Sequence, residues 1–196
     1  MPPNRLKTTL DEIREDYRES YILGDRGDGD FDIGDALRRH LASEPLRETC
    51  PKIPEEQLCA IAFTSGSTGR SQPNRKYWRT LVTGSLSNAR MLLKGIQQPA
   101  SVLSTVPPQH MWGLETSILL PAFSNVSITG RSPFYPQEIK EALQALPAPR
   151  ILVSTPVHLR ALLDSGLELV AVERVLSATA PLSPQVASEL ETKFDT

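Results

Sequence analysis

The 196-residue sequence has very few cysteines and no long apolar run. Cys50 and Cys59 are the only cysteines, and their spacing matches no common metal-binding motif. No stretch reaches the length that spans a bilayer, and the N-terminal residues lack the apolar segment of an export signal. These absences exclude a disulfide-rich scaffold and a membrane-spanning protein, and they predict a cytoplasmic protein with reduced thiols.

Acidic residues are missing from one long window of the chain. Between Glu56 and Glu115 there is no aspartate or glutamate, although the formal charge of the whole chain is only −2. The basic residues inside this window are Arg70, Arg75, Lys76, Arg79, Arg90 and Lys94. Such a local excess of positive charge favours a small anionic ligand, whereas the nearly neutral total gives no general attraction to nucleic acid.

The first part of the chain is acidic and carries apolar residues at helical spacing. Asp28, Asp30 and Asp32 alternate as in a calcium-binding loop, but the glycine and the final glutamate of that motif are not in place. We therefore predict an acidic helical lead-in and linker over 1–54 that supplies no metal ligand. A second domain is predicted over 55–196.

Short apolar runs alternate with helical stretches in this second domain. The runs LCAIAF, SVLSTV, NVSIT, RILVS and VERVLSA are typical of buried strands. Helical periodicity fills the intervals, and Ser183 followed by Pro184 predicts the start of a last helix. This alternation predicts an α/β fold with a mainly parallel sheet flanked by helices.

A run of small polar residues follows the first apolar run. It consists of Thr64, Ser65, Gly66, Ser67, Thr68 and Gly69. We predict a loop from 64 to about 75 and a helix that begins near Lys76. Glycines let consecutive N–H groups turn toward an anion and the hydroxyls add further donors, so a phosphate is the expected ligand. Lys76, Arg75 and Arg70 are the candidate countercharges.

Several well-known loops do not fit this run. Gly66 and Gly69 are too close together for the P-loop pattern, and the dinucleotide pattern G-x-G-x-x-G is absent. Ser67 directly follows Gly66, so the spacing of a nucleophile elbow is also missing. The bare G-x-x-G is shared with RNA-clamping KH loops, but those do not combine a long strand with a run of serine and threonine.

Three stretches, in order, resemble signatures of the adenylate-forming ligases, the superfamily of acyl-CoA synthetases, luciferases and peptide-synthetase adenylation domains. FTSGSTG resembles the phosphate-binding signature of this superfamily. VPPQHMWGLETSILLPAF is similar to the second signature, in which His110 and Gly113 fill two defined places. The resemblance implies that His110 lines the acyl pocket and shifts between the two half-reactions.

The third stretch, VERVLSATAPLSPQVASELETKF, is similar to a strand, turn and helix of the same ligases. Thr179, Ala180 and Pro181 match the turn, which in the superfamily packs near the adenine and the substrate carboxylate. Thr179 replaces a more usual glycine, so we expect the backbone to approach the ligand less closely there.

The first signature departs from the superfamily after Gly69. Ser71 and Gln72 stand where proline and lysine are expected, and Lys76 is the first lysine that follows. Two hypotheses remain open. Either Lys76 replaces the usual cation from a new position, or the loop relies on its backbone and on arginines.

The resemblance covers roughly 55–196, and later signatures of the superfamily do not occur in the chain. These are the Tyr-Gly-x-Thr-Glu motif with its Mg²⁺-binding glutamate, the Thr-Gly-Asp that binds the ribose, the hinge, and the small C-terminal domain with its catalytic lysine. We expect the chain to be part of the large N-terminal domain, with little or no turnover of its own.

The resemblance implies ATP and Mg²⁺ as cofactors and an acyl-adenylate as the intermediate. A small carboxylic acid, such as a fatty or aryl acid, would be activated and passed to the thiol of coenzyme A or an acyl-carrier protein. A non-catalytic nucleotide-binding or interaction module is the alternative. Self-association through exposed sheet edges is a further expectation. His40 and His158 fall within amphipathic helices and are assigned no role.

Overall fold

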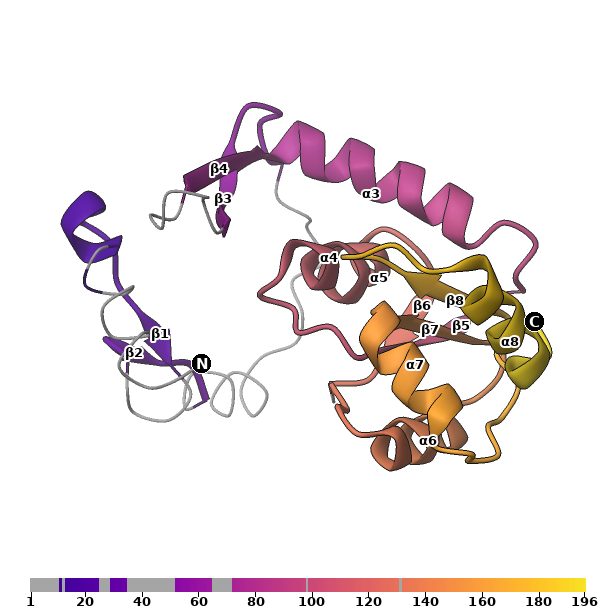
Figure 1. Cartoon of the computed structure of the whole chain (residues 1–196). Helices are drawn as coiled ribbons and strands as arrows, with labels where there is room; N and C mark the ends of the chain where they lie inside the picture. The colour runs from indigo at the N-terminus through magenta and orange to yellow at the C-terminus, as the bar shows by residue number, and fades with distance from the viewer. Residues whose placement is uncertain are drawn as a thin grey trace. The chain divides into compact units, whose positions relative to one another are not determined.

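The structure is a computed structural model that describes residues 11, 13–24, 29–34, 52–64, 72–97, 99–130 and 132–196. The chain divides into two compact units, Met1–Lys52 and Ile53–Thr196 (Figure 1). Each unit is described separately below. The predicted boundary after residue 54 stays a prediction.

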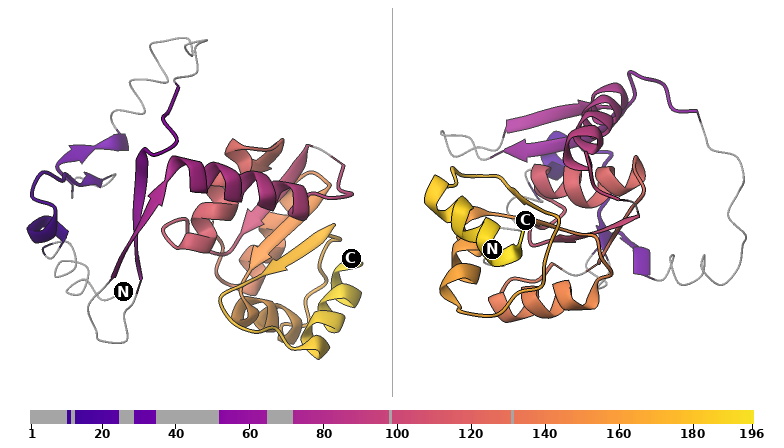
Figure 2. Two further views of the ribbon diagram at one scale, coloured as in Figure 1. Left: turned by 90° about the horizontal axis from the view of Figure 1, so that it is seen from above. Right: turned by 90° about the vertical axis from the view of Figure 1, so that its right-hand side faces the viewer.

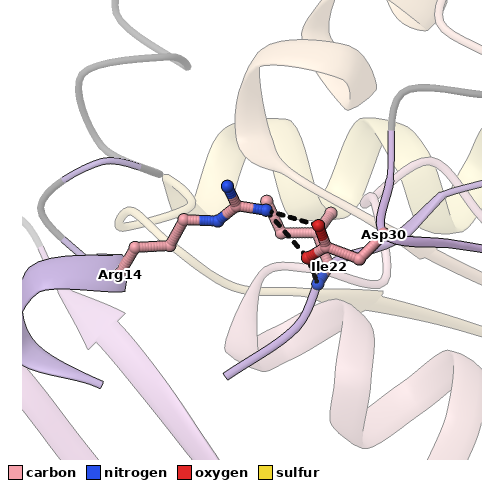
Figure 3. Close-up of polar contacts among 3 residues, drawn as sticks. All are labelled: Arg14, Ile22 and Asp30. Carbon is pink, nitrogen blue, oxygen red and sulfur yellow. Dashed lines mark hydrogen bonds and ion pairs between the residues drawn. The ribbon is translucent and has the colours of Figure 1, made fainter. Parts of the chain in front are cut away.

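The first unit contains two very short strands and a tight polar contact. Strands β1 (Leu23–Gly24) and β2 (Phe31–Asp32) pair in parallel. The Asp30 carboxylate accepts two hydrogen bonds from Arg14 Nη2, at 2.8 and 2.7 Å, and one from the Ile22 N–H at 2.8 Å (Figure 3). The Ile22 N–H, followed by the Arg14 guanidinium, holds the pKa of Asp30 below its usual value. The carboxylate thus joins three separate parts of this unit.

Four parallel strands form the sheet of the second unit. They are β5 (Ala100–Ser104), β6 (Val126–Ile128), β7 (Arg150–Ser154) and β8 (Arg174–Ser177). Their order across the sheet is β6-β5-β7-β8. Strands β5 and β7 are apolar and buried, as expected for central parallel strands. The predicted parallel α/β fold is confirmed.

One face of this sheet is covered by α6 (Pro136–Ala145), α7 (Pro156–Asp164) and α8 (Pro184–Phe194). Leu103 and Leu152 point into this layer and pack in one core with apolar residues of the three helices. Figure 1 shows α6 and α7 together on this side of the sheet.

The opposite face is covered by α3 (Trp78–Leu92) and by a helical segment of three parts, α4 (Met111–Gly113), η1 (Leu114–Leu119) and α5 (Leu120–Ala122). The alternate strand residues Val102, Ile151 and Val153 pack there in a second core. The two views of Figure 2 also show α3 lying across this side of the sheet.

A π-helical stretch interrupts the segment that the sequence predicts as one helix. In η1 the Leu120 N–H donates to Glu115 O, five residues back. Pro121 follows directly and has no N–H to continue an α-helical pattern. The α-helical hydrogen-bond pattern is therefore interrupted in the wider turn before Pro121.

The first predicted strand pairs with a strand that the sequence did not indicate. Strands β3 (Leu58–Thr64) and β4 (Gln72–Tyr77) form an antiparallel hairpin outside the parallel sheet. The predicted loop to about residue 75 is wrong, because Gln72–Tyr77 is a strand, whereas the helix predicted to begin near Lys76 is present and begins at Trp78. The segment QPNRKY has no apolar alternation, and its strand conformation comes from pairing with β3.

The start of α8 agrees with the prediction from sequence. Ser183 Oγ accepts a hydrogen bond from the Val186 N–H at 3.3 Å, and Pro184 occupies the first turn. Among the helices of the described residues, none has the length and apolar character needed to cross a membrane.

Candidate nucleotide and acid site

The hairpin fixes the two ends of the predicted phosphate loop. Thr64 ends β3 and is paired with Gln72, the first residue of β4. Residues 65–71 connect these paired ends, so the predicted ligands Ser65, Gly66, Ser67, Thr68 and Gly69 lie outside the described residues, as does Arg70. Of the six polar positions, the structure therefore locates only the backbone of Thr64.

Lys76 lies at the far end of the hairpin from this loop. It pairs with Ala60, four residues along β4 from Gln72, which corresponds to about 13 Å of extended strand. It borders a cavity of about 90 Å³ whose other lining residues, including Glu115, come from α3 and the α4–η1 segment. The structure thus places Lys76 beside the start of α3, and its role at a phosphate stays a prediction.

The positive character of the acid-free window is only partly neutralised by neighbouring residues. Arg79 Nη1 lies 3.0 Å from Glu56 Oε1, an exposed ion pair just at the window's N-terminal limit. Arg75 is exposed on β4 and Arg90 is exposed on α3. The hairpin and α3 therefore keep exposed cations that are suited to attract an anion.

His110 is on the loop that follows β5, at the start of the α4 segment. Its side chain is exposed, and its backbone is extended immediately before Met111. Gly113 approaches the preceding loop so closely that an added Cβ would lie 2.1 Å from the Pro107 carbonyl oxygen. The close packing of Gly113 against Pro107 thus fixes the short turn that carries His110.

The predicted adenine-side turn follows β8. Thr179, Ala180 and Pro181 are all exposed. Thr179 has φ of +80°, a conformation that favours glycine. Thr179 therefore carries backbone strain at this position, where a glycine would carry none.

These loops belong to one edge of the sheet. His110 follows β5 and Thr179 follows β8, and in a parallel sheet the carboxyl ends of the strands lie on the same side. From β5 the chain turns outward to β6, whereas from β7 it proceeds in the other direction to β8. The carboxyl ends of β5 and β7 thus flank a topological switch point, where ligands of open α/β sheets bind.

A buried polar network at this switch point was not predicted. Thr105, immediately after β5, and Ser154, at the end of β7, join hydroxyl groups at 2.9 Å. His158 Nδ1 lies 2.8 Å from the same Thr105 hydroxyl. Burial lowers the pKa of His158, which favours the neutral ring. The hydroxyl residues at the ends of two apolar runs were the available signal for this cluster.

The fold is that of an α/β protein whose loops gather at the carboxyl edge of a parallel sheet. The model of the AMP-binding enzyme family matches residues 6–196, so the chain belongs to this family. The match also includes most of the lead-in, where the sequence motifs gave no resemblance. No curated protein sequence matches the chain.

Solved structures of similar fold come from ligases. ATP-bound MatB from Rhodopseudomonas palustris superposes with a TM-score of 0.71 at 21% identity, over 99% of this chain and 37% of that chain. A malonyl-CoA ligase complex with methylmalonyl-CoA and AMP gives 0.67 at 17% identity, over 95% and 42%. O-succinylbenzoate coenzyme A synthetase (MenE) from Bacillus subtilis, with AMP, gives 0.64 at 15% identity, over 83% and 33%. The chain thus spans less than half the length of each.

Proposed function

We propose that this chain is part of an ATP-dependent carboxylic acid ligase that forms an acyl-adenylate and then an acyl thioester. The observation that carries the proposal is FTSGSTG, whose first residues end β3 in a chain of the AMP-binding enzyme family. A polar loop with two glycines offers backbone N–H groups to the β- and γ-phosphates of ATP.

In this reaction, the residues that follow the carboxyl ends of the parallel strands would have different roles. A substrate carboxylate attacks the α-phosphorus of ATP, which releases pyrophosphate, and a thiol of coenzyme A or a carrier protein then takes the acyl group. This chemistry requires alignment and neutralisation of charge and no protein nucleophile. His110 would line the acyl pocket, while Thr179, Ala180 and Pro181 would border the adenine and the carboxylate.

Mg²⁺ would neutralise the phosphates during the transfer. Among the described residues, no group of three or more histidine, cysteine, aspartate or glutamate side chains could hold a metal ion. The hydroxyl groups of Ser67 and Thr68 are of the kind that accompanies Mg²⁺ at nucleotide phosphates. We therefore expect this chain to bind ATP and to turn it over slowly or not at all.

Calorimetric titration with ATP and Mg²⁺ tests the phosphate loop. We expect Gly66→Val and Thr68→Ala to weaken ATP binding about tenfold or more, because each removes loop donors or the freedom to present them. Thr83→Ala, an exposed substitution on α3, is the matched control and should leave the affinity unchanged. Equal affinity in all of these variants would contradict the proposal.

Pyrophosphate exchange with a panel of carboxylic acids, measured on the full-length gene product, tests the activity. Acid-dependent exchange supports the ligase. Tight ATP binding without exchange for any acid would instead favour the non-catalytic module that retains the phosphate loop.

A further inference from the structure

The network at the switch point links three side chains in a row by hydrogen bonds. Ser154 is completely buried and Thr105 is only 3% exposed, while the His158 ring is half-buried. Thr105 Oγ1 stands in the middle, 2.9 Å from Ser154 Oγ and 2.8 Å from His158 Nδ1. These three residues come from the end of β5, the end of β7 and the first turn of α7.

The directions of these hydrogen bonds follow from counting donors. Within the described part of the chain, Thr105 is the only side-chain partner recorded for Ser154 Oγ. Because a buried hydroxyl hydrogen needs an acceptor, we assign Ser154 as the donor to Thr105 and the Thr105 hydroxyl as the donor to His158 Nδ1. In this assignment Nδ1 is an acceptor, and the neutral ring carries its hydrogen on Nε2.

Protonation of this ring would disturb both hydrogen bonds of the network. A second ring hydrogen on Nδ1 would reverse both hydrogen bonds, and the buried Ser154 hydroxyl would then lose its acceptor. Burial of the imidazole acts in the same direction and lowers the pKa of His158. In this assignment the hydroxyl pair holds a neutral imidazole whose donor is Nε2–H.

One aromatic side chain packs against the His158 ring. Phe134, between β6 and α6, meets the His158 ring edge-on at 4.9 Å between centroids. Its backbone N–H is held by Glu138 Oε2 at 3.0 Å, although the Phe134 ring remains 62% exposed. Among the described residues, no protein acceptor is recorded for His158 Nε2.

His158 lies near the part of the fold where the proposed acid site is expected. Thr105 begins the same loop that leads to His110, and His158 lies at the β5–β7 switch point. We propose that His158 is a specificity-determining residue whose Nε2–H binds a neutral oxygen on the acyl part of the acid substrate. This inference rests on the proposed ligase function. It assigns as substrates acids that carry a hydroxyl or carbonyl group in addition to the reacting carboxylate.

A neutral oxygen is the acceptor that this arrangement suits. A neutral imidazole donor gives no net charge to balance a second carboxylate, and Thr105, Ser154 and Phe134 supply none either. An acid without the oxygen would leave the Nε2–H unpaired inside the complex, and a site built in this way discriminates strongly against such analogues.

The tautomer can be tested without any enzymatic activity. In the 196-residue chain labelled with ¹⁵N-histidine, the His158 resonances are assigned by their loss in His158→Gln. We expect Nε2 to have the shift of a protonated nitrogen and Nδ1 that of an acceptor. Ser154→Ala removes the hydroxyl group that donates to Thr105. In this variant we expect both tautomers of the His158 ring to be populated. An Nδ1–H tautomer in the unsubstituted chain would overturn the inference.

Ligand discrimination is tested with pairs of acids that differ only in one hydroxyl or carbonyl oxygen, added in the presence of ATP and Mg²⁺. We expect the oxygen-bearing acid to bind about tenfold more tightly and to shift the His158 Nε2 resonance. His158→Gln places an amide donor near Nε2 and should retain the preference. His158→Asn reaches only the Nδ1 position and should bind both acids equally.

Equal binding of the two acids by the unsubstituted chain, or an unchanged preference in His158→Asn, would overturn the inference even if ATP binds as proposed. Oxygen-dependent acid binding in a chain that does not bind ATP would support it and would instead overturn the ligase proposal.

Discussion

At the scale of single residues, Gly113 shows how closely the second signature is packed. Gly113→Ala would place a Cβ 2.1 Å from the Pro107 carbonyl oxygen, so α4 or the loop must move. We expect a loss of about 1–3 kcal/mol in the free energy of unfolding, measured by urea denaturation.

Gly84→Ala is the matched control for this substitution. Gly84 lies in α3, and an added Cβ meets no atom within 4 Å. This variant should gain about 0.5–1 kcal/mol from the better helix propensity of alanine. A loss of similar size in both variants would show that Gly113 has no special packing role.

Thr179 carries backbone strain at a turn predicted to border the ligand. Its φ of +80° is unfavourable for a β-branched residue, so Thr179→Gly should stabilise the chain by about 1 kcal/mol. Thr179→Ala retains the Cβ and should gain much less. Thermal unfolding of the three proteins measures the difference, and a stability order with glycine lowest would contradict this reading.

Asp30 gives a prediction with a defined pH dependence. Its pKa is below the usual 3.8, mainly because of the Ile22 N–H and then Arg14. The folded state thus holds the proton more weakly, so the stabilising contribution is complete above this usual value and is lost as the pH falls through the folded pKa. In Arg14→Gln, carbon-detected NMR titration should show a partial rise of the pKa of Asp30, since the Ile22 hydrogen bond remains.

At the scale of elements, Arg174 connects β8 to the C-terminal end of α3. Its guanidinium donates to the carbonyl oxygens of Met91 at 3.3 Å, of Leu92, and of Lys94 at 3.1 Å. The last carbonyl oxygens of a helix generally lack partners within it, and a cation there is favourable. Arg174→Gln should therefore lower the free energy of unfolding by about 1–2 kcal/mol.

Arg174→Lys should recover part of this loss, because lysine retains the charge but not the planar set of donors. Arg160→Gln, on the exposed side of α7, removes the same group without this contact and serves as the control. Equal urea midpoints for Arg174→Gln and Arg160→Gln would show that the contact contributes nothing to stability.

The elements also show what could be predicted from sequence. Strands β5 and β7 were predictable because both of their faces are buried, and buried parallel strands read as continuous apolar runs. Strand β4 was not, because its polar residues form a strand only through their partner β3. His158 was passed over because the sequence places it on a helix, whereas its partner Thr105 is 53 positions away in the chain.

At the scale of the whole molecule, the two hydrophobic cores found among the described residues belong to the second unit. Every residue of the two cores falls within Ile53–Thr196. We therefore expect residues 53–196 alone to fold cooperatively, with a thermal transition by circular dichroism close to that of the full chain. Absence of a cooperative transition would show that Met1–Lys52 is required for folding.

The two contacts of α3 have a mechanical consequence for the hairpin. Trp78, at the beginning of the helix, packs against Phe123 with 5.8 Å between ring centroids, and Arg174 secures the other end. The helix is therefore held by one contact near each of its ends. Because β4 ends at Tyr77 and α3 begins at Trp78, the contact of Trp78 with Phe123 also ties the base of the hairpin to the segment that covers this face of the sheet.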